Sequence, residues 1–409
     1  MEEQNVIRID EFFNTTSKWL TDNKMVLDDS IIRKLLDATS IVHFTHNDAD
    51  AVGSDLVLRS FMYDTPEIST VFCNTTEAMK NFRNVFSDED FEKWKGTVLI
   101  FSDIGIASDE DLQSLANVCK HFSAVLFVDH HKTNKMMDNK IFEIFPQNVF
   151  HLMVSEIDGI PVSATWLMLI LFSNIFNQTF ERREANKELI RISYEISNYD
   201  TYNFKNRTDL YLTGNERLTS DLIDAVVWNK GDLTLNDVLS RIVEWYDCIV
   251  GTCDDVCYET LQWSQQVQLQ QYAIYKKNEI KALLEKVHVV KFDHTIPELN
   301  RLTANVIAVA NCPFSNELME VLYKTPEYAD NAIVIYVDKM MLSFRSSEIG
   351  ADVSAWAKKL GGGGHAHAAG AYLKDADLFF NILKYCILSP KLSKEGIDAM
   401  KEFSKSIVK

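Results

Sequence analysis

Short apolar segments alternate with helix-like segments over the first third of the chain, and this alternation limits the fold to a few classes. The apolar segments, which have the composition of strands, are 41–44, 70–73, 97–101 and 124–128. The segments between them that have helical character are 55–63 and 109–119. Strands that are apolar throughout are buried on both faces, which is typical of parallel sheets covered by helices. The sequence therefore predicts an α/β fold with a mainly parallel sheet flanked by helices.

Acidic and histidine side chains follow three of these predicted strands. The residues concerned are His46, Asp48, Asp50, Asp103, Asp129, His130 and His131. In parallel sheets, ligands bind beyond the carboxyl ends of the strands. These side chains are therefore predicted to form one site.

The first of these segments has the pattern of a metal site. His46, Asp48 and Asp50 occupy alternate positions, so in an extended segment their side chains share one face. Carboxylates with one or two imidazoles suit Mg²⁺ or Mn²⁺ better than a structural zinc ion. The alternative interpretation is that the polar residues here only cap the helix that follows. Asp103, taken alone, also fits a turn or a helix cap.

His130 and His131 are adjacent, and adjacent side chains diverge unless the backbone turns. We expect one imidazole to bind metal and the other to contact substrate or carry a proton. Asp129 is placed to orient one of the two rings by a hydrogen bond. A polar loop without chemistry is the alternative interpretation.

The composition excludes a protein that acts mainly by coating long nucleic acid. The 409 residues include 41 Lys and Arg against 59 Asp and Glu, a formal net charge of −18. A coating protein should be basic, so any nucleotide must be bound in a local site.

We see no leader-like or membrane-length apolar segment and expect a cytoplasmic location. The seven scattered cysteines, among them Cys248, Cys253 and Cys257, indicate reduced structural thiols.

The ordered set of motifs resembles the DHH family of phosphoesterases. HNDADAVGS at 46–54, the strand-terminal Asp103, Asp-His-His at 129–131 and NYDT at 198–201 occur in the order of the four motifs of that family. SFRSS at 343–347 and GGGGHAHAAG at 361–370 resemble the DHHA1 domain that accompanies the DHH domain in one large branch. The layout is most similar to that of the oligoribonucleases, also called nanoRNases.

The resemblance implies a centre with two divalent ions, with Mn²⁺ expected and Mg²⁺ or Co²⁺ as alternatives. Its implied ligands are His46, Asp48, Asp50, Asp103, His130 and Asp200, with Asp103 as the bridging ligand. The ions would clamp a phosphate and generate hydroxide from a shared water. Family members differ in the position of the first histidine, so the sequence leaves open whether His46 or His43 is the first ligand.

Catalytic and substrate contacts are implied in the same way. His131, with Asp129 beside it, would contact the phosphate and stabilise charge in the transition state. The implied substrate-binding residues are Arg345, Ser346, Gly363, Gly364, His365 and His367. Glycines at 361–364 permit close approach of the backbone and offer N–H groups to a phosphate.

The resemblance also implies a domain layout. An N-terminal helical extension is expected at 1–38, a DHH catalytic domain at 39–250, a helical linker at 251–287 and a smaller α/β DHHA1 domain at 288–409. Cleavage is expected between the two domains, with the linker helix as the hinge.

The resemblance and the acidic charge together predict an enzyme that hydrolyses short RNA, about two to five nucleotides long, to nucleoside monophosphates. The polarity of attack stays open. Alternatives that use the same site are a cyclic or linear dinucleotide phosphodiesterase, a 3′-phosphoadenosine 5′-phosphate phosphatase and a RecJ-like single-strand DNA exonuclease. A scaffold role is disfavoured because the ligand set is complete. The expected partner is a short RNA or dinucleotide rather than a membrane, and a homodimer is compatible with the sequence.

Overall fold

The computed structural model describes residues between 7 and 373, with gaps. The described ranges are 7–62, 67–73, 75–86, 91–106, 109–131, 143–179, 187–228, 263–286, 288–296, 301–309, 331–336, 340–346 and 352–373, together with 234, 242, 314 and 317–318. The chain forms two compact units, Met1–Leu269 and Gln270–Lys409, and each is described by itself.

The first unit contains helices and a parallel sheet. Its helices are α1 (Ile9–Asp22), α2 (Asp29–Leu36), α3 (Ala49–Phe61), α4 (Thr75–Val85), η1 (Phe91–Trp94), α5 (Asp109–Cys119), α6 (Ala164–Thr179), α7 (Lys187–Asp200), α8 (Asn203–Asn206) and α9 (Glu216–Trp228). Its strands are β1 (Ser40–Thr45), β2 (Glu67–Phe72), β3 (Thr97–Ser102), β4 (Ala124–Asp129) and β5 (Val149–Met153), with the short hairpin β6 (Glu156–Ile157) and β7 (Ile160–Pro161).

Strands β1 to β5 form one parallel sheet in the order β2-β1-β3-β4-β5. Thr45 at the end of β1 pairs with Ser102 at the end of β3, and Ser102 pairs with Val128 in β4. The carboxyl ends of these three strands therefore lie side by side. The strand order reverses between β1 and β3, and open α/β sheets bind their ligands at such switch points.

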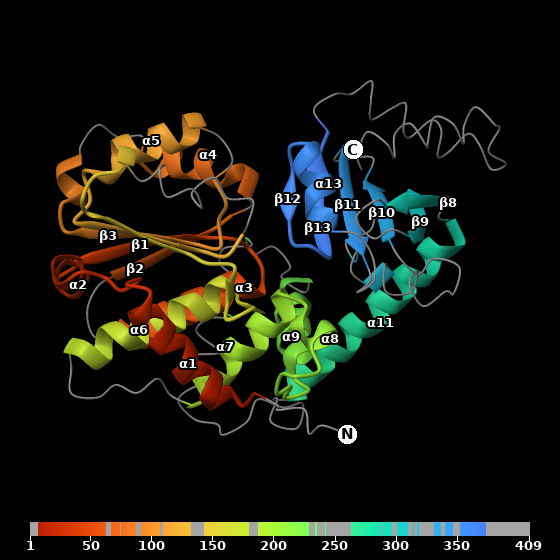
Figure 1. Ribbon diagram of the computed structural model, residues 1–409, viewed down its shortest axis with the longest axis horizontal. Helices are drawn as coiled ribbons and strands as arrows, with labels where there is room; N and C mark the ends of the chain where they lie inside the picture. The colour runs from red at the N-terminus through yellow and green to blue at the C-terminus, as the bar shows by residue number, and fades with distance from the viewer. Residues whose placement is uncertain are drawn as a thin grey trace. The chain divides into compact units, whose positions relative to one another are not determined.

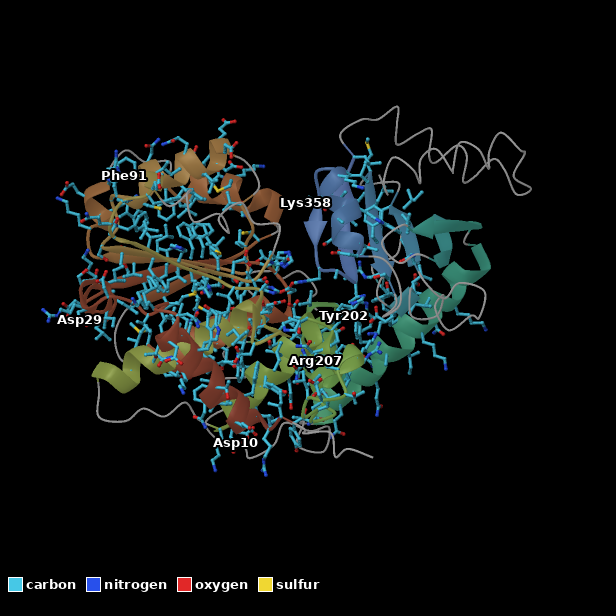
Figure 2. All side chains as sticks on the ribbon, in the orientation of Figure 1. Asp10, Asp29, Phe91, Tyr202, Arg207 and Lys358 are labelled. Atoms are coloured by element: carbon cyan, nitrogen blue, oxygen red, sulfur yellow. The ribbon has the colours of Figure 1, made fainter. Side chains whose placement is uncertain are left out.

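Helices cover both faces of this sheet (Figure 1). On the face of α4 and α5, Phe44, Phe101 and Phe127 form a row with ring centroids 5.4 and 5.0 Å apart. On the other face, which α1, α2, α3, α6 and α7 cover, Trp166 stacks on Phe12. Side chains fill the layers on both sides of the sheet (Figure 2). Burial of both faces explains the continuous apolar runs at 98–101 in β3 and 124–128 in β4.

The described part of the second unit contains a mixed sheet together with α11 and α13. Its described elements are α11 (Trp263–Lys286), which begins in the first unit, and β8 (His288–Ile296), β9 (Arg301–Val309), β10 (Asn331–Tyr336), β11 (Met341–Ser346), α13 (Val353–Lys359), β12 (Gly363–Gly364) and β13 (Ala368–Tyr372). The strand order is β12-β13-β11-β10-β9-β8. β9 and β10 run in parallel, and the other neighbours are antiparallel.

The predicted fold class is confirmed in both units. The four predicted strands are β1 to β4, and the predicted helix at 109–119 is α5. α3 begins at Ala49, earlier than predicted, because the Asp48 side chain caps it there. The sequence did not predict β5, because this edge strand is only partly buried and lacks a continuous apolar pattern.

Two further expectations concern the membrane and the cysteines. Among the described residues, no helix combines the length and the apolar character needed to cross a bilayer. Cys73 and Cys119 are buried, reduced thiols. Cys248, Cys253 and Cys257 lie outside the described residues.

Candidate metal centre

The carboxyl ends of β1, β3 and β4 bring together the side chains that the sequence pattern singled out. His46 follows β1, Asp103 follows β3 and Asp129 ends β4. Asp50 joins them from the first turn of α3, and Asp200 joins them from the last turn of α7. The helices thus add two carboxylates to those that the sheet provides.

Asp103 lies between two groups of possible ligands. Its φ is +53°, a left-handed conformation that Asp tolerates better than most residues. Its N–H donates to the carbonyl oxygen of Val128 at 3.1 Å, which attaches the turn after β3 to β4. Its Oδ1 lies 3.4 Å from Nε2 of His130, and its Oδ2 lies 3.9 Å from Nδ1 of His46. The two oxygens of one carboxylate therefore face two different imidazoles.

All six predicted metal ligands fall into two donor triads, in which one donor atom from each residue lies within 4.8 Å of the others. The first triad is His46, Asp48 and Asp103, and the second triad is Asp50, His130 and Asp200. In the second triad, Nε2 of His130 lies 3.6 Å from Oδ2 of Asp50 and 3.5 Å from Oδ2 of Asp200. Because Oδ1 of Asp103 also approaches His130, Asp103 joins the two triads.

The beginning of α6 holds Asp50 in place. The two carboxylate oxygens of Asp50 accept hydrogen bonds from the N–H groups of Ala164 and Thr165, each at 2.9 Å. The start of a helix offers unpaired N–H groups and the positive end of its dipole, so it stabilises a charged carboxylate. Gly53 permits this approach, because a Cβ there would lie 2.4 Å from Oγ1 of Thr165.

Asp48 caps α3 and also lies in the first triad. Its Oδ1 accepts a hydrogen bond from the N–H of Ala51 at 3.2 Å and so caps α3. Its Oδ2 lies 2.7 Å from Nδ1 of His46, on the side of the first triad. Its side chain is 44% exposed, so a solvated ion can reach this carboxylate.

Of the two histidines considered as first ligand, His46 lies in the first triad, whereas His43 belongs to a buried polar network. Nδ1 of His43 lies 3.0 Å from Oδ1 of Asp55, and its Nε2 lies 2.8 Å from Oγ of Ser102. Nε of Arg59 donates to Oδ2 of Asp55 at 2.8 Å. Because Ser102 directly precedes Asp103 in the chain, the network fixes the end of β3 against β1 and α3. A histidine inside an apolar strand is the sequence signal for this network, which sequence reasoning missed.

The site concentrates negative charge in a buried place. Burial and the carboxylates of Asp48 and Asp50 raise the pKa of Asp103 well above its ordinary value. Burial and the same two carboxylates also raise the pKa of Asp200. Oδ2 of Asp103 is buried and has no hydrogen-bond partner among the described residues. A cation relieves such repulsion, and a donor set of carboxylates and imidazoles fits divalent ions such as Mg²⁺ or Mn²⁺.

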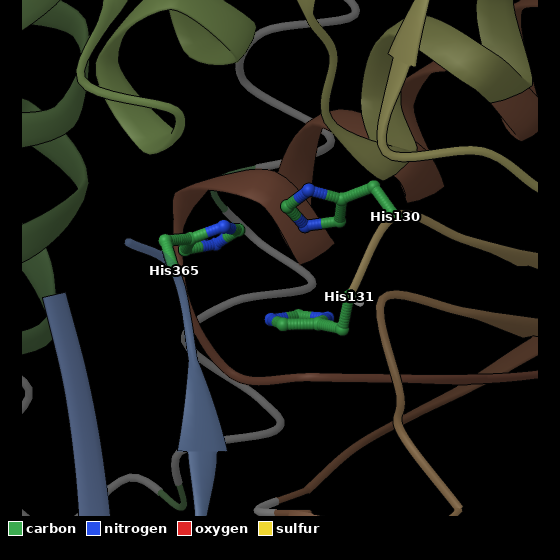
Figure 3. A group of neighbouring side chains, drawn as sticks. All are labelled: His130, His131 and His365. Carbon is green, nitrogen blue, oxygen red and sulfur yellow. The ribbon is translucent and has the colours of Figure 1, made fainter. Parts of the chain in front are cut away.

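His130 and His131 follow β4 with ring centroids 4.4 Å apart and ring planes at 49° (Figure 3). Burial and the charge of His131 lower the pKa of His130 to about 4. Burial also lowers the pKa of His131, but the charge and hydrogen bond of Asp129, whose Oδ1 lies 2.9 Å from Nδ1, outweigh burial and raise it to about 9. One imidazole is thus neutral, as a metal ligand must be, and its neighbour is charged. His365, drawn in the same figure, belongs to the second unit.

The predicted substrate-binding residues all lie on β11, β12 and the turn between β12 and β13. Nη1 of Arg345 donates to Oγ of Ser343 at 3.0 Å and to the carbonyl oxygen of Phe344 at 2.8 Å. Oγ of Ser346 lies 3.1 Å from Nδ1 of His367, and the N–H of Ser346 donates to the carbonyl oxygen of His367 at 3.1 Å. The end of β11 and the turn at 365–367 are therefore linked.

The glycines at 361–364 serve the packing of the second unit. The N–H groups of Gly361 and Gly362 donate to carbonyl oxygens at the end of α13. A Cβ on Gly362 would lie 2.0 Å from the carbonyl oxygen of Gly370, and Gly364 has a φ of +132°. The close backbone approach expected here is thus an approach to β13, and these two N–H groups are used within the unit.

Comparisons with known proteins agree with this architecture. The family described as the DHHA1 domain matches residues 317–387. The chain is 23% identical to the oligoribonuclease NrnB of Bacillus subtilis over 335 residues, which are 81% of this chain and 72% of NrnB.

Two solved structures share the fold at low identity. RecJ from Thermus thermophilus, solved in complex with Mn²⁺, aligns with a TM-score of 0.51 and 13% identity over 87% of this chain and 54% of RecJ. The DHH domain of a member of the s1p family of ribosomal proteins aligns with a TM-score of 0.54 and 10% identity over 91% of this chain and 90% of that chain.

The parallel sheet, the two donor triads and the second unit with its DHHA1 match define a class of two-unit α/β proteins with a polar site at the strand ends. Within that class, the chain resembles the DHH/DHHA1 family, and its layout is similar to that of an oligoribonuclease. The resemblance predicted from the motifs is confirmed.

Proposed function

We propose that the chain is a metal-dependent phosphodiesterase that hydrolyses RNA of about two to five nucleotides to nucleoside monophosphates. The observation that carries this proposal is the pair of donor triads joined by the carboxylate of Asp103. Divalent ions supply charge neutralisation at a phosphate and acidify a water molecule when they are bound. We assign Mn²⁺, the ion named with the solved RecJ structure, with Mg²⁺ and Co²⁺ as alternatives.

The proposed roles divide the site between ion binding and phosphate binding. The residues that would hold the ions are His46, Asp48, Asp50, Asp103, His130 and Asp200. His131 is charged at neutral pH because the nearby Asp129 raises its pKa to about 9. Its imidazolium donates a hydrogen bond to a phosphate oxygen and stabilises the charge that develops during attack. Asp129 keeps the ring in the required orientation.

The substrate class is proposed on two grounds. The relative NrnB is named an oligoribonuclease. The net charge of −18 repels long polyanions, so local phosphate contacts outweigh repulsion only for short ones. The residues proposed to hold the rest of the substrate are Arg345, Ser346, Gly363, Gly364, His365 and His367. We further propose the domain ranges 1–38, 39–250, 251–287 and 288–409 and a cytoplasmic location.

A Mn²⁺-dependent hydrolysis panel on one purified sample tests the proposal. The substrates are a linear diribonucleotide, a five-nucleotide RNA, a five- and a thirty-nucleotide single-stranded DNA, a cyclic dinucleotide and 3′-phosphoadenosine 5′-phosphate. We expect the highest kcat/KM on the short RNAs and a steep fall with length. Asp103→Asn, purified in parallel, should be inactive, which excludes a contaminating nuclease.

Two results would contradict the proposal in different ways. Equal rates on the short and the long single strands would refute the argument from charge. A preference for the long DNA, the cyclic dinucleotide or 3′-phosphoadenosine 5′-phosphate would leave the proposed metal centre intact. It would show that the proposed substrate is wrong.

A further inference from the structure

An aromatic cluster lies on the stretch of chain that carries Asp200. The Phe204 ring is near-parallel to the Tyr199 ring, with centroids 5.4 Å apart and planes at 17°. It is also near-parallel to the Tyr202 ring, with centroids 6.3 Å apart and planes at 30°. All three side chains are partly exposed, and Tyr202 is labelled in Figure 2. Partly exposed, near-parallel rings form a surface on which another flat ring can stack.

The backbone at the centre of this cluster is strained. Tyr202 has a φ of +60° and a ψ of +14°, a left-handed conformation that is unusual for a bulky side chain. Its N–H donates to the carbonyl oxygen of Tyr199 at 3.1 Å, and its own carbonyl oxygen accepts from the N–H of Lys205 at 3.1 Å. The turn therefore holds a phenol ring at a position where glycine would fit more easily, and strain of this kind clusters at functional sites.

A positive charge accompanies the rings. Nζ of Lys205 lies 5.4 Å from the centroid of Tyr202 and 5.3 Å from the centroid of Phe204. The side chain of Lys205 is exposed. In a chain with a net charge of −18, a lysine beside the rings supplies local attraction for an anionic ligand.

We propose that this cluster is a stacking subsite for one nucleobase, with Tyr202 as its principal ring and Lys205 beside a phosphate. The inference rests on the proposed function and names a part of the same site. Tyr202 follows Asp200 by two positions, so their Cα atoms are at most about 7 Å apart. Oδ2 of Asp200 lies 3.5 Å from Nε2 of His130. The turn that carries Tyr202 is therefore next in the chain to a side chain of the centre that would bind the phosphate. Stacking accepts every base and favours the larger purines.

The test compares substitutions that remove or keep the ring. Tyr202→Leu removes the ring and keeps apolar bulk, and Tyr202→Phe keeps the ring. Tyr211→Leu is the matched control, because Tyr211 is a 46% exposed tyrosine of the same unit. KM and kcat are measured for a diadenylate and a diuridylate, and equilibrium binding is measured for AMP, ribose 5-phosphate and Mn²⁺.

We expect Tyr202→Leu to raise KM for the diadenylate and Kd for AMP about tenfold, with a smaller effect on the diuridylate. The affinities for ribose 5-phosphate and Mn²⁺ should not change, because neither has a base. Tyr202→Phe and Tyr211→Leu should behave like the wild type.

Two results would overturn the subsite. One is an unchanged affinity of Tyr202→Leu for AMP, which would mean that the cluster serves internal packing only. The other is an equal loss of affinity for AMP and ribose 5-phosphate, which would mean that the base is not what the ring contacts. If the wild type hydrolyses no dinucleotide, the proposed function fails, whereas the two binding measurements still decide the subsite.

Discussion

Replacing Asp103 by asparagine should stabilise the metal-free protein while it abolishes metal-dependent hydrolysis. A carboxylate oxygen of Asp103 lies within 4.8 Å of one from Asp48 and of one from Asp129. Two unit charges at that distance repel by about 3.5 kcal/mol at an effective dielectric constant of about 20. The imidazolium of His131 cancels part of this repulsion, so we expect a gain of about 1–3 kcal/mol in the free energy of unfolding. Asparagine keeps the shape of the side chain and tolerates the positive φ.

The difference in the free energy of unfolding between Asp103→Asn and the wild type should depend on pH, because the pKa of Asp103 is raised in the folded state. Because the folded pKa lies above the unfolded pKa, the folded state binds more protons between the two values. The contribution of Asp103 to stability is therefore most favourable below the unfolded pKa and is lost as pH rises toward the folded pKa. The advantage of Asp103→Asn in the free energy of unfolding should accordingly grow as the pH rises above the unfolded pKa and shrink as the pH is lowered toward it.

Thermal unfolding in EDTA measures the effect, with Asp55→Asn as the matched control. Asp55 is equally buried, but the hydrogen bond and charge of His43 and the charge of Arg59 outweigh burial and lower its pKa. Breaking such a buried pair costs about 3 kcal/mol or more. Asp103→Asn should therefore raise Tm by about 5 °C, whereas Asp55→Asn should lower it. If both substitutions lower Tm, the argument from carboxylate repulsion is wrong.

Three further predictions concern the ion, the second histidine and the glycine loop. Each bound Mn²⁺ ion, at about a hundredfold excess over its Kd, should raise the free energy of unfolding of the wild type by about 2.7 kcal/mol. Thermal unfolding of Asp103→Asn should show almost no such shift. In EDTA, NMR titration should place the pKa of His131 near 9, and Asp129→Asn should lower it toward about 6.5. Because this folded pKa is raised, the stability that His131 contributes is complete below its unfolded pKa and is lost as pH rises through about 9. Gly362→Ala puts a Cβ 2.0 Å from a carbonyl oxygen of β13 and should destabilise the second unit by at least about 1–3 kcal/mol, whereas at Gly105 a Cβ meets nothing within 4 Å. Equal denaturation midpoints for Gly362→Ala and Gly105→Ala would show that β12 can shift away from β13.

Much of the sheet of the first unit could be predicted, because burial on both faces leaves an apolar pattern within each central strand. β3 and β4 are buried on both faces, so residues 98–101 and 124–128 form continuous apolar runs that end at the site. β5 lies at the edge of the sheet, where partial exposure removes the continuous apolar pattern. The strand order of the second sheet was not predictable, because β11 pairs with β13, which follows α13 and β12 in the chain.

The side chains that gather at the site could be predicted, but their arrangement could not. Alternation and position after strands identify His46 and Asp103 as candidates. The direction of each oxygen of Asp103 depends on its φ of +53° and on its hydrogen bond to Val128. Both features arise from the tertiary structure. The purpose of the glycines at 361–364 could not be predicted either, because a glycine run looks the same whether its backbone approaches a ligand or, as at Gly362 and Gly364, β13.

The hydrogen bonds around the site explain why electrostatic repulsion should destabilise the Asp103 carboxylate more than the other carboxylates. Asp50 accepts two N–H groups from α6, Asp48 caps α3, and Asp129 pairs with His131. Among the described residues, Oδ2 of Asp103 has no such hydrogen bond, and burial hides it from water. Removing the charge of Asp50 would weaken the contact with α6 as well as the second triad, so Asp50→Asn should lose both stability and ion affinity. Removing the charge of Asp103 breaks no hydrogen bond of its Oδ2 among the described residues. Stability and ion affinity should therefore change in opposite directions at Asp103 and in the same direction at Asp50.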